Sequence, residues 1–106
     1  MIKARFYRNK EGGLYGFRVQ DHGDSIVCAA VSALVMNCVN SIEALTDIAM
    51  KCESKEKDGV ITCELPTVKA GGHHHDADLF LQALHLGLSS IAVEYDEHIR
   101  VYDEEV

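Results

Sequence analysis

A histidine and a cysteine stand close together in the stretch His22–Leu34, with five residues between His22 and Cys28. The apolar residues around and after Cys28 recur at helical spacing, so the thiol is expected in the first turn of a helix. The partial positive charge at a helix N-terminus favours the thiolate, and a neighbouring imidazole can hold the proton. A thiolate and a proton acceptor are the two parts of a minimal cysteine nucleophile.

Two interpretations of Cys28 stay open at this level. Free cysteine is among the most buried residue types, so Cys28 could simply fill space at a helix start. Against that, Ala29, Ala30 and Ala33 keep the helix slim, which leaves room for a substrate chain near the sulfur. The backbone amides of a first turn also lack partners within the helix, and such amides can donate to the oxyanion that forms when a carbonyl is attacked.

His22 is the candidate base, although an exposed loop histidine is the commoner case for one histidine taken alone. Asp21 or Asp24 could orient its imidazole as the third member of a triad does, and either is equally suited to a turn or a helix cap. Ser32 lies about one helical turn after Cys28, so it is expected to border the site unless its hydroxyl bonds the preceding turn. The predicted site is therefore His22 and Cys28, with Asp21, Asp24 and Ser32 as candidate supporting residues.

Three consecutive histidines, His73 to His75, form the other conspicuous cluster, with Asp76 beside them. Metal sites usually combine ligands from separated positions, and three neighbouring side chains cannot all face one ion without strain. We therefore expect a solvated loop before a helix rather than a metal site, although histidine-rich tracts can bind metals. No residue is predicted to bind a cofactor.

The composition is that of an ordinary globular domain. The chain has 106 residues, of which 47% are hydrophobic and 25% charged, so a single domain over residues 1–106 is expected. The net charge of −7 argues against direct binding of nucleic acid and suits a basic partner better. No apolar run is expected to cross a membrane, and the alternating N-terminus lacks the apolar block of a signal peptide. A cytoplasmic protein is the default expectation.

The four cysteines, Cys28, Cys38, Cys52 and Cys63, include no CxxC pair. In a cytosolic chain they are expected to be free thiols rather than a disulfide framework. Cys38, Cys52 and Cys63 lie in apolar patterns, so each is predicted to be a small core residue.

The elements that must position these residues follow from the hydropathy pattern. Alternating segments predict strands and helical spacing predicts helices, with Asp24 or Ser25 as the cap of the first helix. In chain order the predicted elements are strands at 2–8 and 14–20, a helix at 25–45, strands at 47–53 and 60–65, a helix at 75–95 and a strand at 98–102. A linker is predicted at 67–72 and a solvated acidic tail at 103–105. The order ββαββαβ predicts an α/β fold of the α+β type, with two helices packed on one face of a mostly antiparallel sheet.

The segment Ile26–Leu34, with His22 upstream, resembles the ribosomal-processing cysteine protease family called Prp. The resemblance extends over nearly the whole chain, through Met1–Ala4, Asn40–Ile42, Gly87–Leu88 and Ile99–Val101. It implies a small α/β protein that forms a homodimer and removes a short N-terminal extension from the large-subunit ribosomal protein numbered twenty-seven. It also implies that Cys28 is the nucleophile and His22 its partner.

Two features depart from that family's pattern. The family usually has Gly-His-Ala where this chain has Asp21-His22-Gly23, and its loop between the histidine and the cysteine is several residues longer. The resemblance predicts a cysteine endopeptidase that acts on a ribosomal-protein precursor. The short loop instead favours a non-catalytic dimeric module that binds a ribosomal protein or an assembly factor. A third interpretation, metal binding by the histidine run 73–75, has the weakest support.

Overall fold

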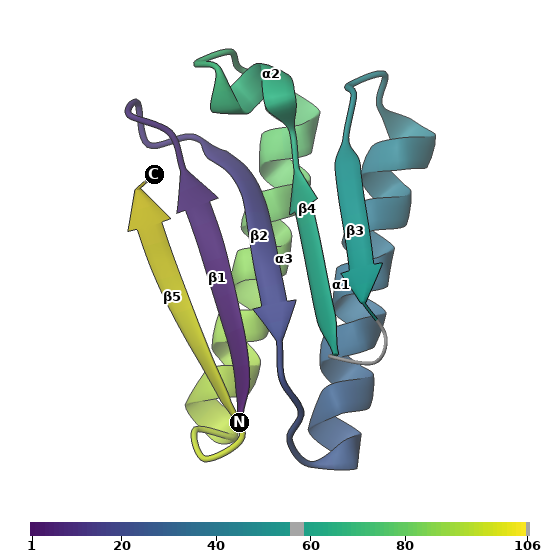
Figure 1. The fold of residues 1–106 in the computed structure, drawn as a ribbon, viewed down its shortest axis with the longest axis vertical. Helices are drawn as coiled ribbons and strands as arrows, with labels where there is room; N and C mark the ends of the chain where they lie inside the picture. Colours follow the sequence, from purple (N-terminus) through teal and green to yellow (C-terminus); the bar gives the residue numbers. More distant parts are fainter. Residues whose placement is uncertain (56–58, 106) are drawn as a thin grey trace.

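The computed structural model describes residues 1–55 and 59–105. A five-stranded sheet has the strand order β3-β4-β2-β1-β5, and the long helices α1 (Ser25–Leu45) and α3 (His75–Glu94) both cover one of its faces (Figure 1). The predicted order ββαββαβ and the α+β class are confirmed. The short helix α2 (Pro66–Lys69) is an addition, since a linker was predicted there. Proline is well suited to begin a helix because its fixed φ is helical and its missing N–H is not needed there.

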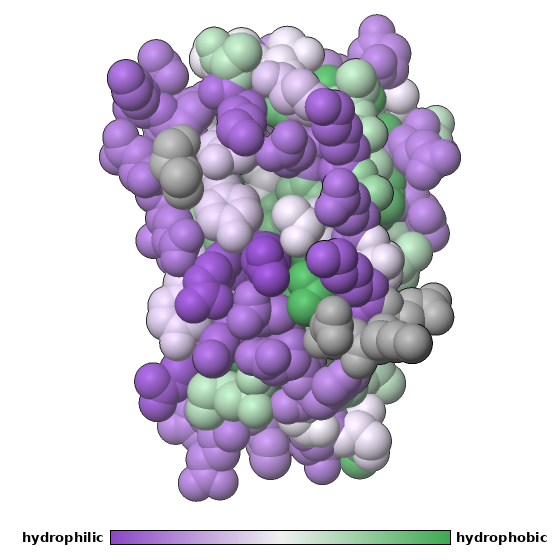
Figure 2. Space-filling model, viewed as in Figure 1, coloured by the Kyte–Doolittle hydropathy of each residue, from purple (hydrophilic) through white to green (hydrophobic). Residues whose placement is uncertain are grey.

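The N-terminal hairpin forms the middle of the sheet. Strands β1 (Ile2–Arg8) and β2 (Leu14–Gln20) pair antiparallel, with Phe6 opposite Phe17. Both rings are fully buried beneath the helices, because side chains alternate between the two faces of a strand. The opposite face of the sheet is uncovered and mostly hydrophilic (Figure 2).

Asn9 organises the turn of this hairpin. Its side-chain oxygen accepts hydrogen bonds from the backbone N–H groups of Glu11 at 3.0 Å and Gly13 at 2.9 Å. Its side-chain amide donates to the carbonyl oxygen of Val68 in α2 at 2.9 Å. This buried polar side chain is therefore satisfied, and it ties the turn to a segment far along the chain.

Each long helix buries a single stripe against the sheet. The buried residues of α1 are Val27, Val31, Val35, Cys38, Val39 and Ile42, and those of α3 are Ala77, Leu81, Leu84 and Leu88. Three apolar residues of the predicted helical pattern, Ile26, Leu34 and Leu45, are instead exposed to 74%, 37% and 69%. A sheet can cover only one side of a helix, so Ile26 and Leu45 face outward. Leu34 instead lies against α3, where a Cβ at Gly87 would be 3.0 Å from its Cδ1.

The second hairpin is displaced from its predicted position. Strand β3 (Lys51–Lys55) begins later and ends later than the predicted strand 47–53, whereas β4 (Val60–Glu64) nearly matches the predicted strand 60–65. Residues 56–58, which lie between the two predicted strands, are outside the described residues. The partner strand decides where a β-strand begins, and hydropathy alternation alone does not locate that partner.

Cys52 and Cys63 form a disulfide between β3 and β4. The expectation of free thiols was wrong for this pair, and Cys52 is exposed rather than part of the core. The physical reason is register: the two cysteines are directly opposite each other, with 4.2 Å between their Cα atoms. Cys28 and Cys38 are free, and Cys38 is buried as predicted.

The C-terminal strand β5 (Ile99–Glu105) pairs parallel with β1 and includes the acidic residues 103–105. The prediction of a tail was therefore wrong, because the strand continues through these residues, although Asp103 and Glu105 are exposed as predicted. Basic side chains of β1 supply the missing partners, and the Arg5 Nε donates to the carboxylate of Glu104 at 3.1 Å. The strand that carries the C-terminal acidic residues thus forms one edge of the sheet.

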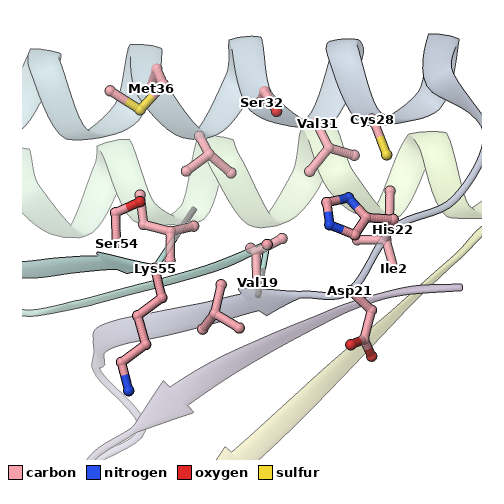
Figure 3. Close-up of a pocket in the computed structure, with 14 residues that line it drawn as sticks. Ile2, Val19, Asp21, His22, Cys28, Val31, Ser32, Met36, Ser54 and Lys55 are labelled. Atoms are coloured by element: carbon pink, nitrogen blue, oxygen red, sulfur yellow. The ribbon is translucent and has the colours of Figure 1, made fainter. Parts of the chain in front are cut away.

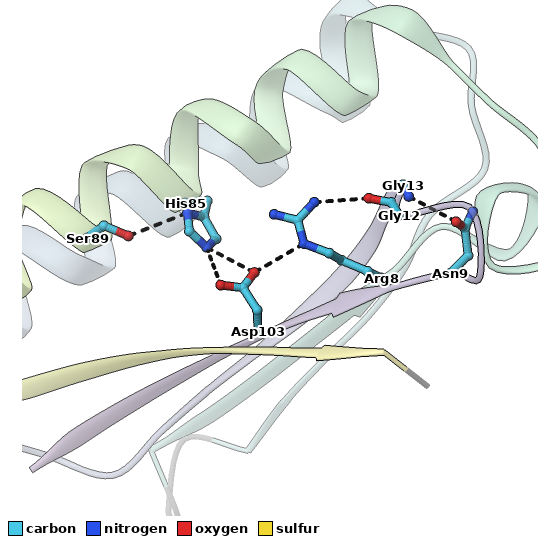
Figure 4. Close-up of polar contacts among 7 residues, drawn as sticks. All are labelled: Arg8, Asn9, Gly12, Gly13, His85, Ser89 and Asp103. Atoms are coloured by element: carbon cyan, nitrogen blue, oxygen red, sulfur yellow. Dashed lines mark hydrogen bonds and ion pairs between the residues drawn. The ribbon is translucent and has the colours of Figure 1, made fainter.

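Asp103 joins three elements at this edge (Figure 4). Its carboxylate lies 3.0 Å from the His85 Nε2 of α3 and 3.2 Å from the Arg8 Nε of β1. Partial burial raises the pKa of Asp103, but the hydrogen bonds and charges of His85 and Arg8 outweigh it, and the net pKa is lowered. The contacts therefore stabilise the ionised carboxylate.

An Asp103→Asn substitution is expected to destabilise the protein at neutral pH. Because the folded-state pKa is below the ordinary aspartate value of about 3.9, the stabilisation is present above that value and is lost as the pH falls through the folded-state pKa. The carboxylate is 45% exposed, so the effect should be at most about 1 kcal/mol, as for accessible ion pairs. Urea unfolding of both proteins between pH 7 and pH 2 checks this. A stability difference that stays constant over this range contradicts the assignment.

By length and composition, α1 is the one helix in residues 1–55 and 59–105 that could cross a membrane. Its 18-residue apolar window has a mean hydropathy of 1.8. By length and hydropathy, the expectation that no segment could cross a membrane was therefore wrong. One third of that window (33%) is buried, and core helices of soluble proteins pass the same test.

Candidate active site

Cys28 lies in the first turn of α1, just after the short loop that follows β2. Asp24 is the N-cap, and its Oδ1 accepts hydrogen bonds from the backbone N–H groups of Ile26 at 2.9 Å and Val27 at 3.3 Å. Of the two predicted alternatives for the cap, Asp24 is therefore confirmed. The thiol of Cys28 is partly exposed and lies at the positive end of the helix dipole.

The backbone of Gly23 approaches the sulfur of Cys28 closely. Its N–H donates to Sγ at 3.3 Å, and its carbonyl oxygen lies 3.7 Å from the same atom. The N–H can donate to the sulfur and the carbonyl can accept from the thiol, so the backbone of Gly23 fixes the position of the sulfur at the start of the helix. A Cβ at position 23 would lie only 3.1 Å from the carbonyl oxygen of His98. Glycine therefore allows the chain to pass close to His98 at the point where it contacts the sulfur. Sequence reasoning missed this role, although a glycine just before a helix cap is a signal for close backbone contact.

Three amides at the start of α1 are not available as the sequence suggested. Those of Ile26 and Val27 donate to the Asp24 carboxylate, and that of Cys28 donates to the Asp24 carbonyl oxygen at 2.8 Å. The cap satisfies these groups, which is why they do not face the groove. The donor that points at the sulfur is instead the N–H of Gly23.

His22 follows β2 and points into the same groove as Cys28 (Figure 3). Its backbone carbonyl accepts a hydrogen bond from the N-terminal ammonium group at 2.9 Å. Within the described residues its imidazole forms no hydrogen bond, with Cys28 or with any other group. The ring lies directly over Gly59, where a Cβ would be 2.5 Å from the imidazole Nε2.

The candidate supporting residues differ in their contacts. Asp21 lines the groove, but its carboxylate faces Lys3 at 3.8 Å, and that of Asp24 caps the helix. Neither is hydrogen-bonded to the imidazole of His22 in the described part of the chain. Ser32 lines the groove one turn beyond Cys28, and its hydroxyl forms no bond to the preceding turn among these residues. Ser32 is therefore free to contact a molecule in the groove.

The groove has a volume of about 270 Å³ and lies between α1 and the sheet (Figure 3). Its apolar wall is formed by residues of α1, β2 and β4: Val31, Val35, Met36, Val19, Val60 and Ile61. Strand β3 contributes Ser54 and Lys55 at the far end. A partly exposed thiol beside an imidazole, in a long apolar groove, is suited to attack on a carbonyl of a bound peptide.

A family model described as cysteine protease Prp matches residues 1–100 of the chain. The chain belongs to the Prp family. It is therefore a cysteine protease, as the resemblance of the segment around Cys28 predicted.

Similar proteins cover nearly the full length of this Prp-family chain. The ribosomal processing cysteine protease Prp of Bacillus subtilis is 26% identical over 107 residues, covering 95% of this chain and 96% of that protein. A crystal structure of the Staphylococcus aureus protease Prp with a covalently linked product peptide has a TM-score of 0.88 at 28% identity, and covers 98% of this chain and 100% of that one. A Streptococcus mutans crystal structure has a TM-score of 0.83 at 31% identity, with coverage of 100% and 96%.

The histidine run of this Prp-family protease is engaged in local contacts. His74 is the N-cap of α3, where its Nδ1 accepts from the Ala77 N–H at 3.1 Å and its Nε2 lies 3.3 Å from Asp47. His75 contacts the neighbouring Asp76 at 3.0 Å. Residues 1–55 and 59–105 contain no group of three side chains able to hold a metal ion.

Gly59→Ala is expected to impair this Prp-family protease by displacing the ring of His22. The φ of Gly59 is +61°, and a Cβ there would overlap the imidazole. Since a misplacement of about 1 Å can cost on the order of 100-fold, we expect kcat/KM for peptide cleavage to fall by about 10-fold or more. Gly12→Ala is the matched control, because Gly12 has a φ of +84° with no neighbouring atom within 4 Å. Equal losses in both variants contradict the proposed contact.

Proposed function

We propose that this Prp-family protease removes an N-terminal extension from the precursor of the large-subunit ribosomal protein numbered twenty-seven. The observation that carries the proposal is that the Cys28 thiol and the His22 imidazole face one apolar groove. The relatives support it, since they are named ribosomal processing proteases, and the Staphylococcus aureus enzyme has been crystallised with a substrate peptide.

In the proposed reaction Cys28 attacks the scissile carbonyl, while His22 holds the proton of the thiol. The N–H of Gly23 lies 3.3 Å from the sulfur, and we assign it the role of donor to the oxyanion that forms. His22 then gives the proton to the leaving amine, and the new N-terminus departs. Water hydrolyses the remaining thioester and regenerates Cys28.

The groove supports an apolar substrate segment. Its wall carries Val31, Val35 and Met36 on one side and Val19 and Ile61 on the other. Burial of the apolar side chains of an extended peptide in this groove stabilises the complex by about 25 cal/mol per Å² of apolar surface removed from water. The net charge of −7 suits a basic ribosomal-protein precursor, which is a weaker but consistent argument.

We also propose that the protease acts as a homodimer in the cytoplasm. Apolar side chains project from the outward faces of both long helices, among them Ile26 at 74%, Leu86 at 69% and Val93 at 84% exposure. Such residues are typical of a surface that a second copy covers. Sedimentation equilibrium measures the state directly, and a monomer at all concentrations contradicts the dimer.

Incubation with a peptide that spans the N-terminal extension tests the proposed activity, with the products read by mass spectrometry. We expect one defined cut. No cut by a folded protein contradicts the proposal and favours the alternative, a non-catalytic module that binds a ribosomal protein or assembly factor. That alternative has one specific observation in its favour, the absence of a hydrogen bond between His22 and Cys28 among the described residues. Alkylation of Cys28 by iodoacetamide separates the two: an activated thiolate reacts unusually fast, whereas a module shows ordinary reactivity.

A further inference from the structure

The Cys52–Cys63 pair is a second site of cysteine chemistry, separate from Cys28. The two residues are directly opposite each other on β3 and β4, and a disulfide joins them. Cys52 is exposed, whereas Cys63 is only 2% exposed. A reactant from solution therefore meets the pair at Cys52, whereas Cys63 is protected.

The position of the pair in the ladder keeps the two sulfur atoms close in either oxidation state. Their Cα atoms are 4.2 Å apart, near the value of about 4.5 Å for pairs that exchange no backbone hydrogen bonds. Bonded and non-bonded pairs alternate in an antiparallel ladder, so the neighbouring pairs, Lys51 with Glu64 and Glu53 with Thr62, are the ones expected to exchange backbone hydrogen bonds and hold the strands on both sides. The disulfide can therefore form and break without moving the strands apart first.

Strand β3 has little else to hold it. It is an edge strand (Figure 1). All five of its residues are exposed. In the described part of the chain, β4 is the only element with which it has extensive contact. An edge strand with no buried side chains opens easily, so a covalent tie to β4 contributes much of its order.

This tie is directly next to the substrate groove. Ser54 and Lys55 follow Cys52 on β3, Ile61 precedes Cys63 on β4, and all three line the groove that contains Cys28. Loosening β3 would move one wall of the groove. The cysteines are therefore only two or three positions along the backbone from residues that line the groove, and a change in the disulfide is expected to affect the groove.

We propose that Cys52 and Cys63 form a reversible thiol–disulfide exchange site, whose reactants are low-molecular-weight thiols and disulfides, and which sets how tightly the groove holds a peptide. The effect on the groove rests on the proposed proteolytic function. In the cytoplasm proposed above, reductants keep Cys28 as the thiol that proteolysis needs. An exposed disulfide in the same chain meets those reductants, and disulfides in such surroundings are usually transient.

The exchange balances in two steps. The thiolate of a small thiol attacks the Sγ of Cys52, which gives a mixed disulfide and releases Cys63 as a thiolate that takes up a proton. A second small thiol then displaces Cys52 and leaves as the oxidised disulfide of the reductant. Two electrons and two protons pass to the protein. A small disulfide reverses both steps.

The remaining buried cysteine does not compete in this exchange. Cys38 is 5% exposed, and burial raises its pKa to about 11. Its thiol lies 3.5 Å from the carbonyl oxygen of Phe80. A protonated, buried thiol is unreactive towards disulfides, so exchange is confined to the pair and to Cys28.

The first test is a titration of the Cys28→Ala protein with reduced and oxidised glutathione, in which free thiols are trapped by iodoacetamide and read by mass spectrometry. We expect Cys52 and Cys63 to gain and lose the label together, with a midpoint within the range set by glutathione. Cys38 serves as the internal control and should stay unlabelled while the protein is folded. A pair that never forms the disulfide, or one that glutathione never reduces, overturns the proposal.

The second test compares the oxidised and reduced forms of the same protein. We expect the amides of residues 51–55 to exchange with deuterium about 10-fold faster or more after reduction, and the affinity for the precursor peptide to fall roughly 3- to 10-fold. The Cys52→Ser, Cys63→Ser double variant should behave like the reduced form under both conditions. Equal deuterium-exchange rates of residues 51–55 in the oxidised and reduced forms contradict the coupling between the disulfide and the groove. The deuterium-exchange measurement needs no peptide. It therefore distinguishes a failure of the thiol–disulfide site from a failure of the proposed substrate.

Discussion

Replacing Cys28 with alanine is expected to abolish cleavage of the precursor peptide and to leave the fold and peptide binding intact. In the proposed reaction the sulfur forms the bond to the scissile carbonyl, and Cys28 is the one cysteine among the described residues that lines the groove. Loss of a nucleophile leaves only binding and oxyanion stabilisation, so the rate should fall on the order of 10⁴-fold or more. Mass spectrometry of the peptide over a long time course measures the residual rate.

The fold should survive this change. Alanine is the best helix former, and Cys28 is only partly buried, so the main loss is the contact with the Gly23 N–H. We expect the free energy of unfolding to change by no more than about 1 kcal/mol. Cys38→Ala is the matched control in the same helix: it removes a buried thiol, so stability should fall by roughly 1 kcal/mol while cleavage persists. A Cys28→Ala protein that still cuts the peptide excludes Cys28 as the nucleophile.

The helix that carries Cys28 was predictable because its signals are local. Asp24 caps the first turn, and buried residues at helical spacing run to Ile42. At the other end Thr46 adopts an extended backbone conformation, and its hydroxyl bonds the carbonyl of Ile42. Both ends of α1 were therefore predicted at the residues where the structure places them. No partner element is needed to read such signals.

The two edges of the sheet were predicted less well, because their signals are non-local. Residues 103–105 are charged and were predicted to be a tail, yet Glu104 and Asp103 pair with side chains of β1 and α3. At the other edge, the disulfide depends on the register between β3 and β4. The free-thiol expectation was argued from the cellular compartment, and that argument contains no geometry. In both cases the interacting residue lies on another element, so the hydropathy of the local sequence does not indicate the interaction.

The candidate site shows the same division. The cysteine at a helix start and the histidine before it could be predicted, and the short loop after β2 does bring both to one groove. The roles of Gly23 and Gly59 could not, because each depends on an approach between backbone and side chain that only the folded chain creates. The oxyanion donors were misplaced for a related reason, since Asp24 already accepts from the amides of Ile26, Val27 and Cys28.

Replacing His22 with alanine is expected to lower kcat for peptide cleavage by about 100- to 10,000-fold, the usual contribution of general acid–base catalysis, with little change in KM. The imidazole lies in the groove beside the thiol and outside the buried core, and the contact of its backbone carbonyl with the N-terminus does not need the side chain. The fold should therefore persist, and initial rates over a range of peptide concentrations separate kcat from KM.

Two further variants decide what His22 does. His22→Asn keeps a polar side chain over Gly59 but cannot carry a proton between the thiol and the leaving amine, so it should be about as inactive as the alanine variant. His73→Ala removes an exposed histidine far along the chain and should cleave normally. If the asparagine variant instead keeps most of the activity, the imidazole only fills space beside Cys28. Proton transfer would then fall to another group or to water, and the pairing inferred from the sequence would be a matter of packing rather than chemistry.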